Sequence, residues 1–331
     1  MPDAPLELTL VGCGQIARAY LQALDGVSTL RLCAAVDPDA TAAAALAEAA
    51  AVPAFASIDA MWNAGVRPQA ALVLAPPDRH ESLSIDLLQR GLDVLCEKPL
   101  APTIAAAERM LATATATGRR LMMGSKFRYT ADILTAHDLL AAGYCGDVVM
   151  YENVFCSHVD MTARWNAIAS HSGGGVLIDN GCHSVDVARF LLGPIARVQA
   201  QFGRVAQDVA VEDTARLLFT SESGALGSID LSWSMHKETA AYVRVHGTAG
   251  TLEIGWRQSR RKRVSDAGWT EFGTGYDKVA AFRAQLQNFA AAVLGLEVPL
   301  IGDEDALASV VVIDSAYRSQ REERWVAVEA R

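Results

Sequence analysis

Residues 6–17 read Leu-Glu-Leu-Thr-Leu-Val-Gly-Cys-Gly-Gln-Ile-Ala. The apolar run from Leu6 to Val11 predicts a buried strand, and the glycines after it predict a tight turn into a helix. In this Gly12-x-Gly14-x-x-Ala17 pattern, the first glycine makes the turn, the second admits a pyrophosphate to the backbone, and the small third residue lets helix and strand pack closely. Taken alone, the pattern also fits a purely structural turn.

The following residues favour a dinucleotide site. Gln15 and Ile16 begin the helix whose positive end would face the phosphates. The next predicted strand ends in Asp37, about twenty residues after the loop, where a carboxylate accepts hydrogen bonds from the adenosine ribose and repels a 2′-phosphate. No arginine directly follows Asp37. We therefore expect NAD in preference to NADP, although Arg18 or Arg31 can in principle serve a 2′-phosphate.

Composition narrows the class of partner. The 331 residues are 51% hydrophobic and carry a formal net charge of -9, which argues against nucleic acid because phosphate binding needs a concentrated basic face. The N-terminus lacks the pattern of a signal peptide, and no apolar run approaches the roughly 20 residues that span a bilayer. Six cysteines lie far apart, without the spacing of a disulfide framework or metal site. We expect a cytoplasmic protein with a small-molecule substrate, no metal and no membrane partner.

The first 125 residues alternate strand-like and helix-like segments, which is typical of a parallel sheet with crossover helices. We expect an N-terminal α/β domain of the Rossmann fold over residues 1–125. Strands are predicted over 6–11, 30–36, 71–74, 94–96 and 121–124, with helices from about 16 and over 39–50, 78–90 and 103–117.

The pattern changes after about residue 125. Alternating runs predict strands over 198–205, 214–219, 225–233, 242–246, 251–254 and 325–328, and glycine-containing turns over 221–224 and 247–250 predict hairpins. Helices are predicted over 130–142, 176–192, 278–294 and 304–318. We expect a C-terminal α+β domain over residues 126–331, built on a large, open, mainly antiparallel sheet.

A proline-containing segment follows the third predicted strand. Ala75 and Pro76 lie at the rim where ligands bind in open α/β sheets, and prolines fix the chain without offering amide donors. We expect this segment to form a wall of the cofactor cleft. His80 fits a cofactor contact or a residue of the first turn of the next helix equally well.

Lys98 lies between Glu97 and Pro99, immediately beyond another predicted strand. At that position its ammonium can point into the crevice beside a nicotinamide. A lone lysine after a strand is usually a solvated surface group, and the glycine loop upstream is what favours a functional role.

Asp179 and His183 are spaced i and i+4, which places them on one face of a predicted helix, and Asp186 continues the same stripe. Gly173-Gly174-Gly175 begins that helix and indicates close approach of a ligand or of backbone. Considered alone, such a histidine is more often a hydrogen-bonded structural residue than a base.

These segments together resemble the glucose-fructose oxidoreductase and inositol dehydrogenase family (Gfo/Idh/MocA), over essentially the whole chain. The resemblance rests on the glycine loop, on Glu97-Lys98-Pro99, on the Gly-Gly-Gly-x-Leu-x-Asp-x-Gly-x-His segment at 173–183 and on the strand-rich second half. It implies an NAD(P)-dependent oxidoreductase that interconverts a secondary hydroxyl and a ketone on a sugar, a cyclitol or a sugar derivative.

The resemblance also implies roles for three residues. His183 would be the general acid/base for the hydroxyl proton, Lys98 would bind the same oxygen and stabilise its developing charge, and Asp179 would orient the substrate or the imidazole. Glu97 and Lys98 would also contact the cofactor. The family expectation for assembly is a homodimer or homotetramer packed through the open sheets.

Other polar residues have two interpretations each. Lys126 and Arg128 fit substrate contacts or a surface or hinge role. Trp165 fits stacking on the nicotinamide, lining of the substrate pocket or a buried anchor. His158, at the exit of a strand, fits the substrate cleft or a solvated loop. The basic run at 260–263 fits a phosphate site or, more readily, a charged edge that discourages aggregation.

Two other functions are compatible with the same residues. A redox-neutral enzyme such as an epimerase or a glycoside-cleaving enzyme would oxidise its substrate transiently with retained NAD. A sensor of NAD or of a sugar would bind without turnover, although it would have no need for the proton relay that Lys98, Asp179 and His183 provide.

Overall fold

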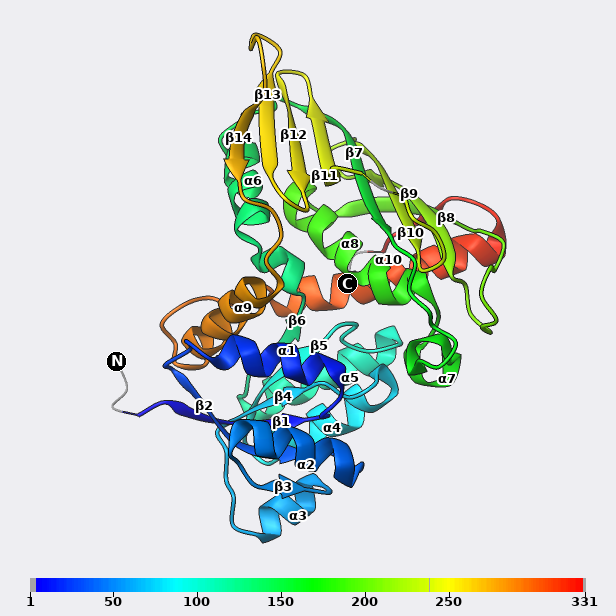
Figure 1. The fold of residues 1–331 in the computed structure, drawn as a ribbon. Helices are drawn as coiled ribbons and strands as arrows, with labels where there is room; N and C mark the ends of the chain where they lie inside the picture. The colour runs from blue at the N-terminus through cyan, green and yellow to red at the C-terminus, as the bar shows by residue number, and fades with distance from the viewer. Residues whose placement is uncertain (1–3, 238, 330–331) are drawn as a thin grey trace. The chain divides into compact units, whose positions relative to one another are not determined.

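The computed structural model describes residues 4–237 and 239–329, and the chain divides into two compact units (Figure 1). Unit 1 contains the chain up to Lys126 together with Lys278–Leu307, and unit 2 contains Phe127–Asp277 and the residues from Ala308 on. The first segment of unit 1 therefore ends close to the predicted boundary at 125. Residues 278–307 belong to unit 1, although the predicted second domain, over residues 126–331, includes them.

Unit 1 is built on a six-stranded sheet with the order β3-β2-β1-β4-β5-β6. Every pairing in this sheet is parallel, as expected for a Rossmann fold. Its strands are β1 (Leu6–Val11), β2 (Leu30–Val36), β3 (Ala54–Phe55), β4 (Ala70–Val73), β5 (Asp93–Glu97) and β6 (Leu121–Gly124). Because parallel strands point the same way, their carboxyl ends share one edge of the sheet.

Helices connect these strands, and one helix of unit 1 comes from much later in the chain. α4 packs against α5, while α1 packs against α9, where the Tyr20 and Phe282 ring centroids are 4.3 Å apart. The helices are α1 (Gln15–Leu24), α2 (Ala40–Ala50), α3 (Ile58–Asn63), α4 (Pro77–Gln89), α5 (Ile104–Thr117) and α9 (Lys278–Val293).

Unit 2 is built on a nine-stranded sheet with the order β14-β13-β12-β11-β7-β10-β9-β8-β15. β7 and β10 pair in parallel and the other neighbours pair antiparallel, so the sheet is mixed but mainly antiparallel, as expected. The strands are β7 (Val148–Cys156), β8 (Ile195–Phe202), β9 (Thr214–Ser221), β10 (Leu226–Ser232), β11 (Ala241–Gly247), β12 (Gly250–Gly255), β13 (Ser259–Arg263), β14 (Thr270–Gly273) and β15 (Val326–Ala327).

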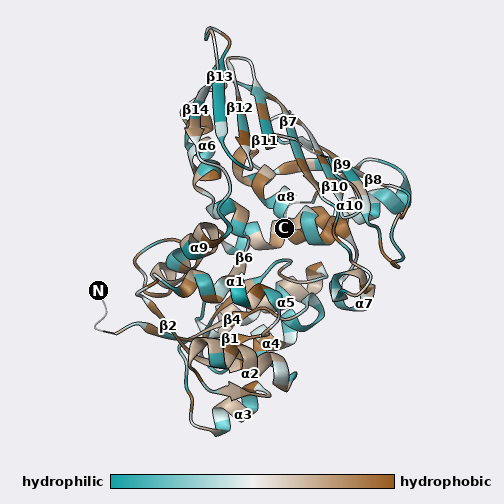
Figure 2. Cartoon of the chain, viewed as in Figure 1, coloured by the Kyte–Doolittle hydropathy of each residue, from teal (hydrophilic) through white to brown (hydrophobic). Residues whose placement is uncertain are grey.

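Alternation of side chains gives this sheet a buried face and an accessible face. Buried residues alternate with more exposed ones along β8, β9, β10 and β12, and hydrophobic and hydrophilic residues both appear along these strands (Figure 2). The buried face packs on α8, which contacts β7, β9 and β10, and on α6, which contacts β12 and β14. The remaining helical elements are η1 (Lys126–Tyr129), α6 (Ala131–Ala141), η2 (Trp165–Ala167), α7 (Ala169–Ser172), α8 (Val176–Leu192) and α10 (Asp303–Glu322).

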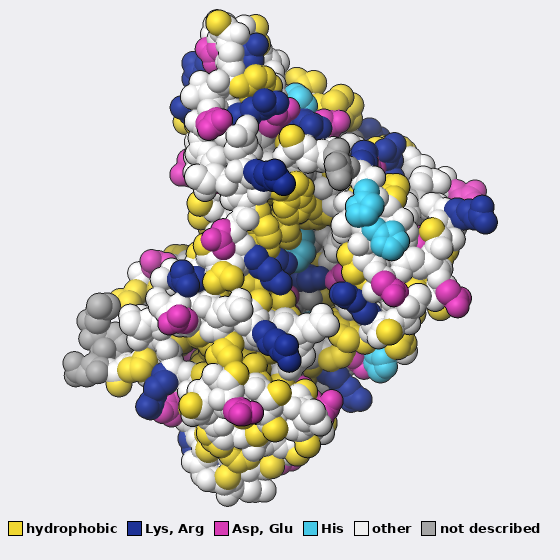
Figure 3. Space-filling model, in the orientation of Figure 1, with side chains coloured by type: hydrophobic (Ala, Val, Ile, Leu, Met, Phe, Trp, Pro, Cys, Tyr) yellow, Lys and Arg dark blue, Asp and Glu magenta, His cyan; other side chains and the backbone are white. Residues whose placement is uncertain are grey.

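The surface charge is mixed in sign. Acidic and basic side chains are interspersed over the face shown in Figure 3. The basic run on β13 has partners within unit 2, because Arg260 donates to Glu253 at 2.6 Å while Arg261 and Arg263 lie over the ring of Tyr144. This arrangement favours the charged-strand interpretation of the run over a phosphate site. Across residues 4–237 and 239–329, no helix is both long and apolar enough to cross a membrane.

Candidate active site

The glycine loop joins β1 to α1 at the carboxyl edge of the parallel sheet. Gly12 has φ +99°, and a Cβ at this position would lie 2.7 Å from the backbone of Leu74 and of Ala75. Gly14 caps α1 without a side-chain hydrogen bond in the described chain, and a Cβ there would meet nothing within 4 Å. An open helix N-terminus that begins at Gln15 fits a pyrophosphate, because its free amides and its dipole both favour an anion.

Asp37, at the end of β2, holds this loop in place. Its Oδ2 accepts from the Cys13 amide at 2.6 Å, and its Oδ1 accepts from the Asp39 amide at 2.8 Å. Each carboxylate oxygen has a further lone pair, so both remain able to accept from a ribose hydroxyl. Asp37 therefore has a structural task in addition to the ribose contact that the sequence predicts.

His80 connects two segments at the same edge. Its ring is buried, with Nε2 2.8 Å from the Ala75 carbonyl oxygen and Nδ1 2.8 Å from the Pro99 carbonyl oxygen. Burial lowers the pKa of His80, and the two carbonyl groups oppose that effect. Both ring nitrogens lie within hydrogen-bond distance of carbonyl oxygens of the protein. His80 therefore stabilises the segment at Ala75 and Pro76 and does not offer a nitrogen to a ligand.

Lys98 begins the turn that follows β5. Its backbone N–H donates to the Gly124 carbonyl at 3.2 Å and to Oε2 of Glu97 at 3.1 Å, and the residue is half-buried. β4 lies between β1 and β5, so Lys98 and the glycine loop share one edge of one sheet. The structure thus places the glycine loop, Asp37, Ala75 and Lys98 at one edge of one sheet within unit 1, whereas Trp165, also predicted to contact the cofactor, belongs to unit 2.

Asp179 and His183 lie one turn apart on α8 in unit 2. The Nδ2 of Asn166 is 3.5 Å from Oδ1 of Asp179. His183 is 5% exposed, and its imidazole meets the ring of Phe127 edge to face, with 5.0 Å between centroids. Packing therefore fixes the plane of the imidazole, which suits a group that must exchange a proton in one direction.

The glycine run before α8 is explained by close approach of other segments of unit 2. A Cβ on Gly174 would lie 2.0 Å from the hydroxyl oxygen of Tyr317, and a Cβ on Gly175 would lie 2.0 Å from the carbonyl oxygen of Glu212. The sequence indicated a close approach here without identifying the approaching groups. Glu212 and Tyr317 are thus residues that sequence reasoning missed.

Glu212 caps α8. Its Oε1 accepts from the amides of Gly175 at 3.0 Å and Leu177 at 3.1 Å, and from the Tyr317 hydroxyl at 2.7 Å. Burial and the neighbouring Glu212 raise the pKa of Tyr317, so the phenol stays protonated and remains a donor. A carboxylate at a helix N-terminus also interacts favourably with the helix dipole. The helix that carries Asp179 and His183 is therefore fixed at its first turn.

Arg128 is committed to a buried ion pair. Both partners are almost fully buried, and Arg128 Nε donates to Asp186 Oδ2 at 3.2 Å while Nη2 donates to Oδ1. The guanidinium also lies over the ring of Phe190, 5.0 Å from its centroid. The predicted substrate contact of Arg128 is therefore replaced by a structural role, because moving either charge would leave the other buried and unpaired.

The remaining predicted residues are accessible to different degrees. Lys126 is half-buried, with Nζ 5.6 Å from the centroid of Phe282. His158 is exposed beyond β7 and stacks on His236 with 5.9 Å between ring centroids. Trp165 is 40% exposed, which is too accessible for the buried-anchor interpretation.

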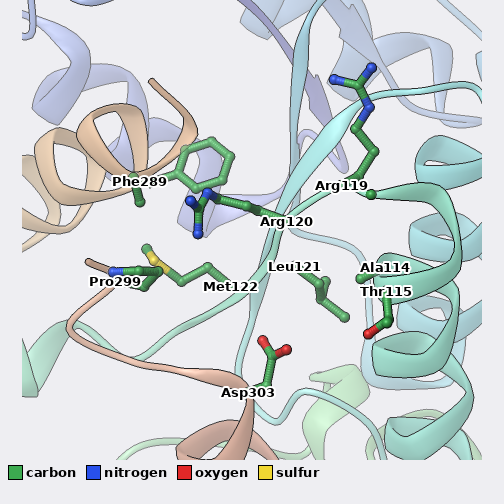
Figure 4. A pocket seen from close by; sticks show the side chains of 11 residues that line it. Ala114, Thr115, Arg119, Arg120, Leu121, Met122, Phe289, Pro299 and Asp303 are labelled. Carbon is green, nitrogen blue, oxygen red and sulfur yellow. The ribbon is translucent and has the colours of Figure 1, made fainter. Parts of the chain in front are cut away.

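A cavity of about 250 Å³ lies in unit 1, and Figure 4 shows the side chains that line it. It is lined by Arg119, Arg120 and Leu121, where β6 begins, and by Pro299 and Asp303. The amino ends of parallel strands lie at the opposite edge from the glycine loop and Lys98. The cavity is therefore separate from the cofactor cleft that the loop defines.

The fold and the glycine loop define an NAD-binding oxidoreductase. Residues 6–125 match the model of the oxidoreductase family with an NAD-binding Rossmann fold, and residues 133–253 match the GFO/IDH/MocA C-terminal domain. The chain belongs to the GFO/IDH/MocA family of oxidoreductases.

Several dehydrogenases are similar to this chain over most of its length. D-apiose dehydrogenase of Paraburkholderia graminis is 28% identical, over 97% of this chain and 89% of that protein. Inositol 2-dehydrogenase of Rhizobium meliloti is 27% identical, over 96% of this chain and 98% of that protein. A levoglucosan dehydrogenase solved with NADH and levoglucosan has a TM-score of 0.89 at 19% identity, covering 98% of this chain and 99% of that one. At that identity the last comparison supports the fold alone.

We predict that Gly175→Ala destabilises unit 2, because the added methyl group cannot avoid the backbone oxygen of Glu212 by a side-chain rotation. A loss of about 1–3 kcal/mol in the free energy of unfolding is expected, measured by urea denaturation. Gly268→Ala is the matched control, since a Cβ at Gly268 meets nothing within 4 Å. Equal stability of the two variants would show that the close approach at Gly175 does not constrain α8.

Proposed function

We propose that this oxidoreductase interconverts a secondary hydroxyl and a ketone on a sugar, a cyclitol or a sugar derivative, with NAD as the hydride carrier. The observation that carries the proposal is the pairing of Asp179 and His183 on one face of a capped helix, in a chain whose other unit presents Lys98 beside a dinucleotide loop. The names of the sequence relatives support the substrate class, since apiose is a sugar and inositol is a cyclitol.

Each of the three residues has one task in the oxidation. His183 takes the hydroxyl proton as general base. Lys98 donates a hydrogen bond to the same oxygen and stabilises the negative charge that develops there. Asp179 orients the substrate or the imidazole. When bound, NAD supplies the acceptor for the hydride that leaves the carbinol carbon as the C=O bond forms.

The remaining assignments divide between cofactor and substrate. Gly12, Gly14, Gln15, Ile16 and Ala17 would hold the pyrophosphate, with Ala75 and Pro76 as the wall of the cleft. Trp165 is sufficiently exposed to stack on the nicotinamide or to line the substrate pocket. Lys126 and His158 remain candidates for substrate contact, whereas the buried pairing of Arg128 removes it from that group.

We further propose that the accessible face of the nine-stranded sheet joins two copies of the chain into a homodimer, or four into a tetramer. Leu226 and Met150 are directly paired across β10 and β7, and they are 53% and 46% exposed. Leu218 on β9 is also exposed. Apolar side chains clustered on an otherwise polar sheet face are typical of a protein interface.

Replacement of the catalytic residues gives the first test of this function. A screen of inositols, pyranoses, aminocyclitols and nucleotide sugars for NAD reduction identifies the substrate, and Lys98→Ala and His183→Ala should then each lower kcat/KM by roughly 100-fold or more. NADH binding, followed by fluorescence, is expected to be unchanged in His183→Ala and weakened but still measurable in Lys98→Ala, which loses a predicted cofactor contact while the glycine loop stays intact. Undiminished hydride transfer in either variant would contradict the mechanism.

A second test concerns the choice of dinucleotide. Asp37→Ala removes the ribose acceptor and the hydrogen bond that it accepts from the Cys13 amide of the loop, so we expect NAD affinity to fall roughly 10- to 100-fold, with no compensating gain for NADP. Asp39→Ala is the control, because Asp39 accepts from two amides of α2 and makes no bond to the glycine loop. Tighter binding of NADP to Asp37→Ala than of NAD to the native chain would overturn this assignment.

A third test concerns assembly. Static light scattering at micromolar concentration is expected to give the mass of a dimer or a tetramer. Leu226→Asp places a charge at the centre of the apolar cluster, and it should shift the population toward the monomer. A native chain that is monomeric under these conditions would exclude the proposed interface.

A further inference from the structure

Three buried polar side chains of unit 1 form a chain of hydrogen bonds that ends at the backbone of Lys98. Tyr20 on α1 and Gln285 on α9 are both 0% exposed, and Glu97 at the end of β5 is 9% exposed. Gln285 Nε2 donates to the Tyr20 hydroxyl at 2.7 Å, and that hydroxyl donates to Glu97 Oε1 at 2.6 Å. The other oxygen of Glu97 accepts from the Lys98 amide at 3.1 Å.

The direction of every bond in this chain is determined by the carboxylate. An ionised Glu97 can only accept, so Tyr20 must donate its single proton to it. The Tyr20 oxygen can then only accept from Gln285, which fixes the orientation of the amide. Gln285 Oε1 is buried and has no hydrogen-bond partner within residues 4–237 and 239–329. The hydrogen bond from Nε2 to Tyr20 therefore determines how the Gln285 amide is oriented.

Packing holds the same groups in place. The ring of Phe282, one turn before Gln285 on α9, lies 4.3 Å from that of Tyr20. A Cβ on Gly124 would lie 3.1 Å from the Tyr20 hydroxyl and 3.2 Å from Gln285 Nε2, so the glycine at the end of β6 leaves room for the pair. Burial, followed by the charge of Glu97, raises the pKa of Tyr20 well above its ordinary value, which keeps the phenol a donor.

We propose that Tyr20 and Gln285 are positioning residues for Lys98, acting through Glu97. Tyr20 and Gln285 hold the Glu97 carboxylate, which accepts a hydrogen bond from the Lys98 amide. The Gly124 carbonyl oxygen accepts from the same amide at 3.2 Å. The backbone that carries the lysine side chain is thereby fixed from two sides, and the ammonium is aimed at the reacting oxygen. This inference rests on the proposed function, because it takes Lys98 to be the residue that binds that oxygen.

The first experiment compares two tyrosine variants. Tyr20→Phe leaves Glu97 and the Gln285 amide without their shared partner, and we expect kcat to fall on the order of 10- to 100-fold while KM and the affinity for NADH change much less. Tyr151→Phe is the matched control, because the Tyr151 hydroxyl is equally buried and has no hydrogen-bond partner within the described chain. Equal kcat for the two variants would overturn the proposal.

A second variant adds a readout that simple loss of packing would not produce. Gln285→Glu is nearly isosteric, but the introduced carboxyl can donate to Tyr20 only while it is protonated. Burial and the nearby Glu97 would raise the pKa of that carboxyl above its unfolded value. Turnover relative to the native chain is therefore expected to be largest at low pH and to fall as pH rises through that pKa. A pH profile that superimposes on the native one would contradict the proposal.

Different results exclude the proposed function and the positioning role. If Lys98→Ala keeps full turnover, the proposed function itself is wrong. If Lys98→Ala loses turnover while Tyr20→Phe and Gln285→Glu both behave like Tyr151→Phe, the function stands and the positioning role is excluded. Circular dichroism and thermal unfolding identify any variant that has not folded, and the pH profile of Gln285→Glu then decides the question without Tyr20→Phe.

Discussion

Parallel alignment of the strands in unit 1 is the constraint on which the cofactor site depends. Because β1, β2, β4 and β5 all point the same way, the residues that follow them meet at one edge of the sheet. The glycine loop, Asp37, Ala75 and Lys98 therefore become neighbours although they are spread over more than a quarter of the chain. Polar contacts across that edge connect the turns to one another: Asp37 accepts from the Cys13 amide of the loop, and the two ring nitrogens of His80 lie 2.8 Å from the carbonyl oxygens of Ala75 and Pro99.

Buried carboxylates accept hydrogen bonds from the segments that carry the predicted site residues. Glu97 accepts a hydrogen bond from the Lys98 amide, and Asp186 accepts from the guanidinium of Arg128. Glu212 accepts from the amides of Gly175 and Leu177 at the start of α8. In each case the charge is compensated by donors from segments distant in sequence. Such bonds are strong in a low-dielectric interior and fix backbone direction, which is what a site that aligns a hydride and a proton requires.

Local patterns predicted most of the fold. The strands β1, β2 and β6 and the helix α8 have the predicted bounds, because strand-like alternation, short apolar runs and helical periodicity are local signals. β7 was not among the predicted strands, although it lies at the centre of the second sheet, since Glu152 and Asn153 interrupt its apolar pattern. β3 and α3 contain 2 and 6 residues, too few for a period to be recognised.

The candidate site also contains residues that the sequence predicts and residues that it does not. Residues within short motifs, such as Lys98 or the Asp179 and His183 pair, are predictable because their spacing carries the chemistry. Their supports are not, since Gln285 is 265 positions from Tyr20, and Tyr317 is 105 positions from Glu212. No local period encodes such a pairing. The glycines at 174 and 175 indicated that some group comes close, and only the fold identifies it.

Transfer of deuterium from substrate to cofactor distinguishes net hydride transfer to NAD from a redox-neutral reaction. A candidate polyol or sugar, labelled with deuterium on the carbinol carbon and not preselected for NAD reduction, is mixed with excess enzyme and NAD, and both products are analysed by mass spectrometry after a single turnover. We expect one deuterium in the reduced cofactor and none on the ketone carbon. Deuterium that ends in a sugar product, with NAD unlabelled and oxidised, would contradict the proposed function and establish a redox-neutral reaction.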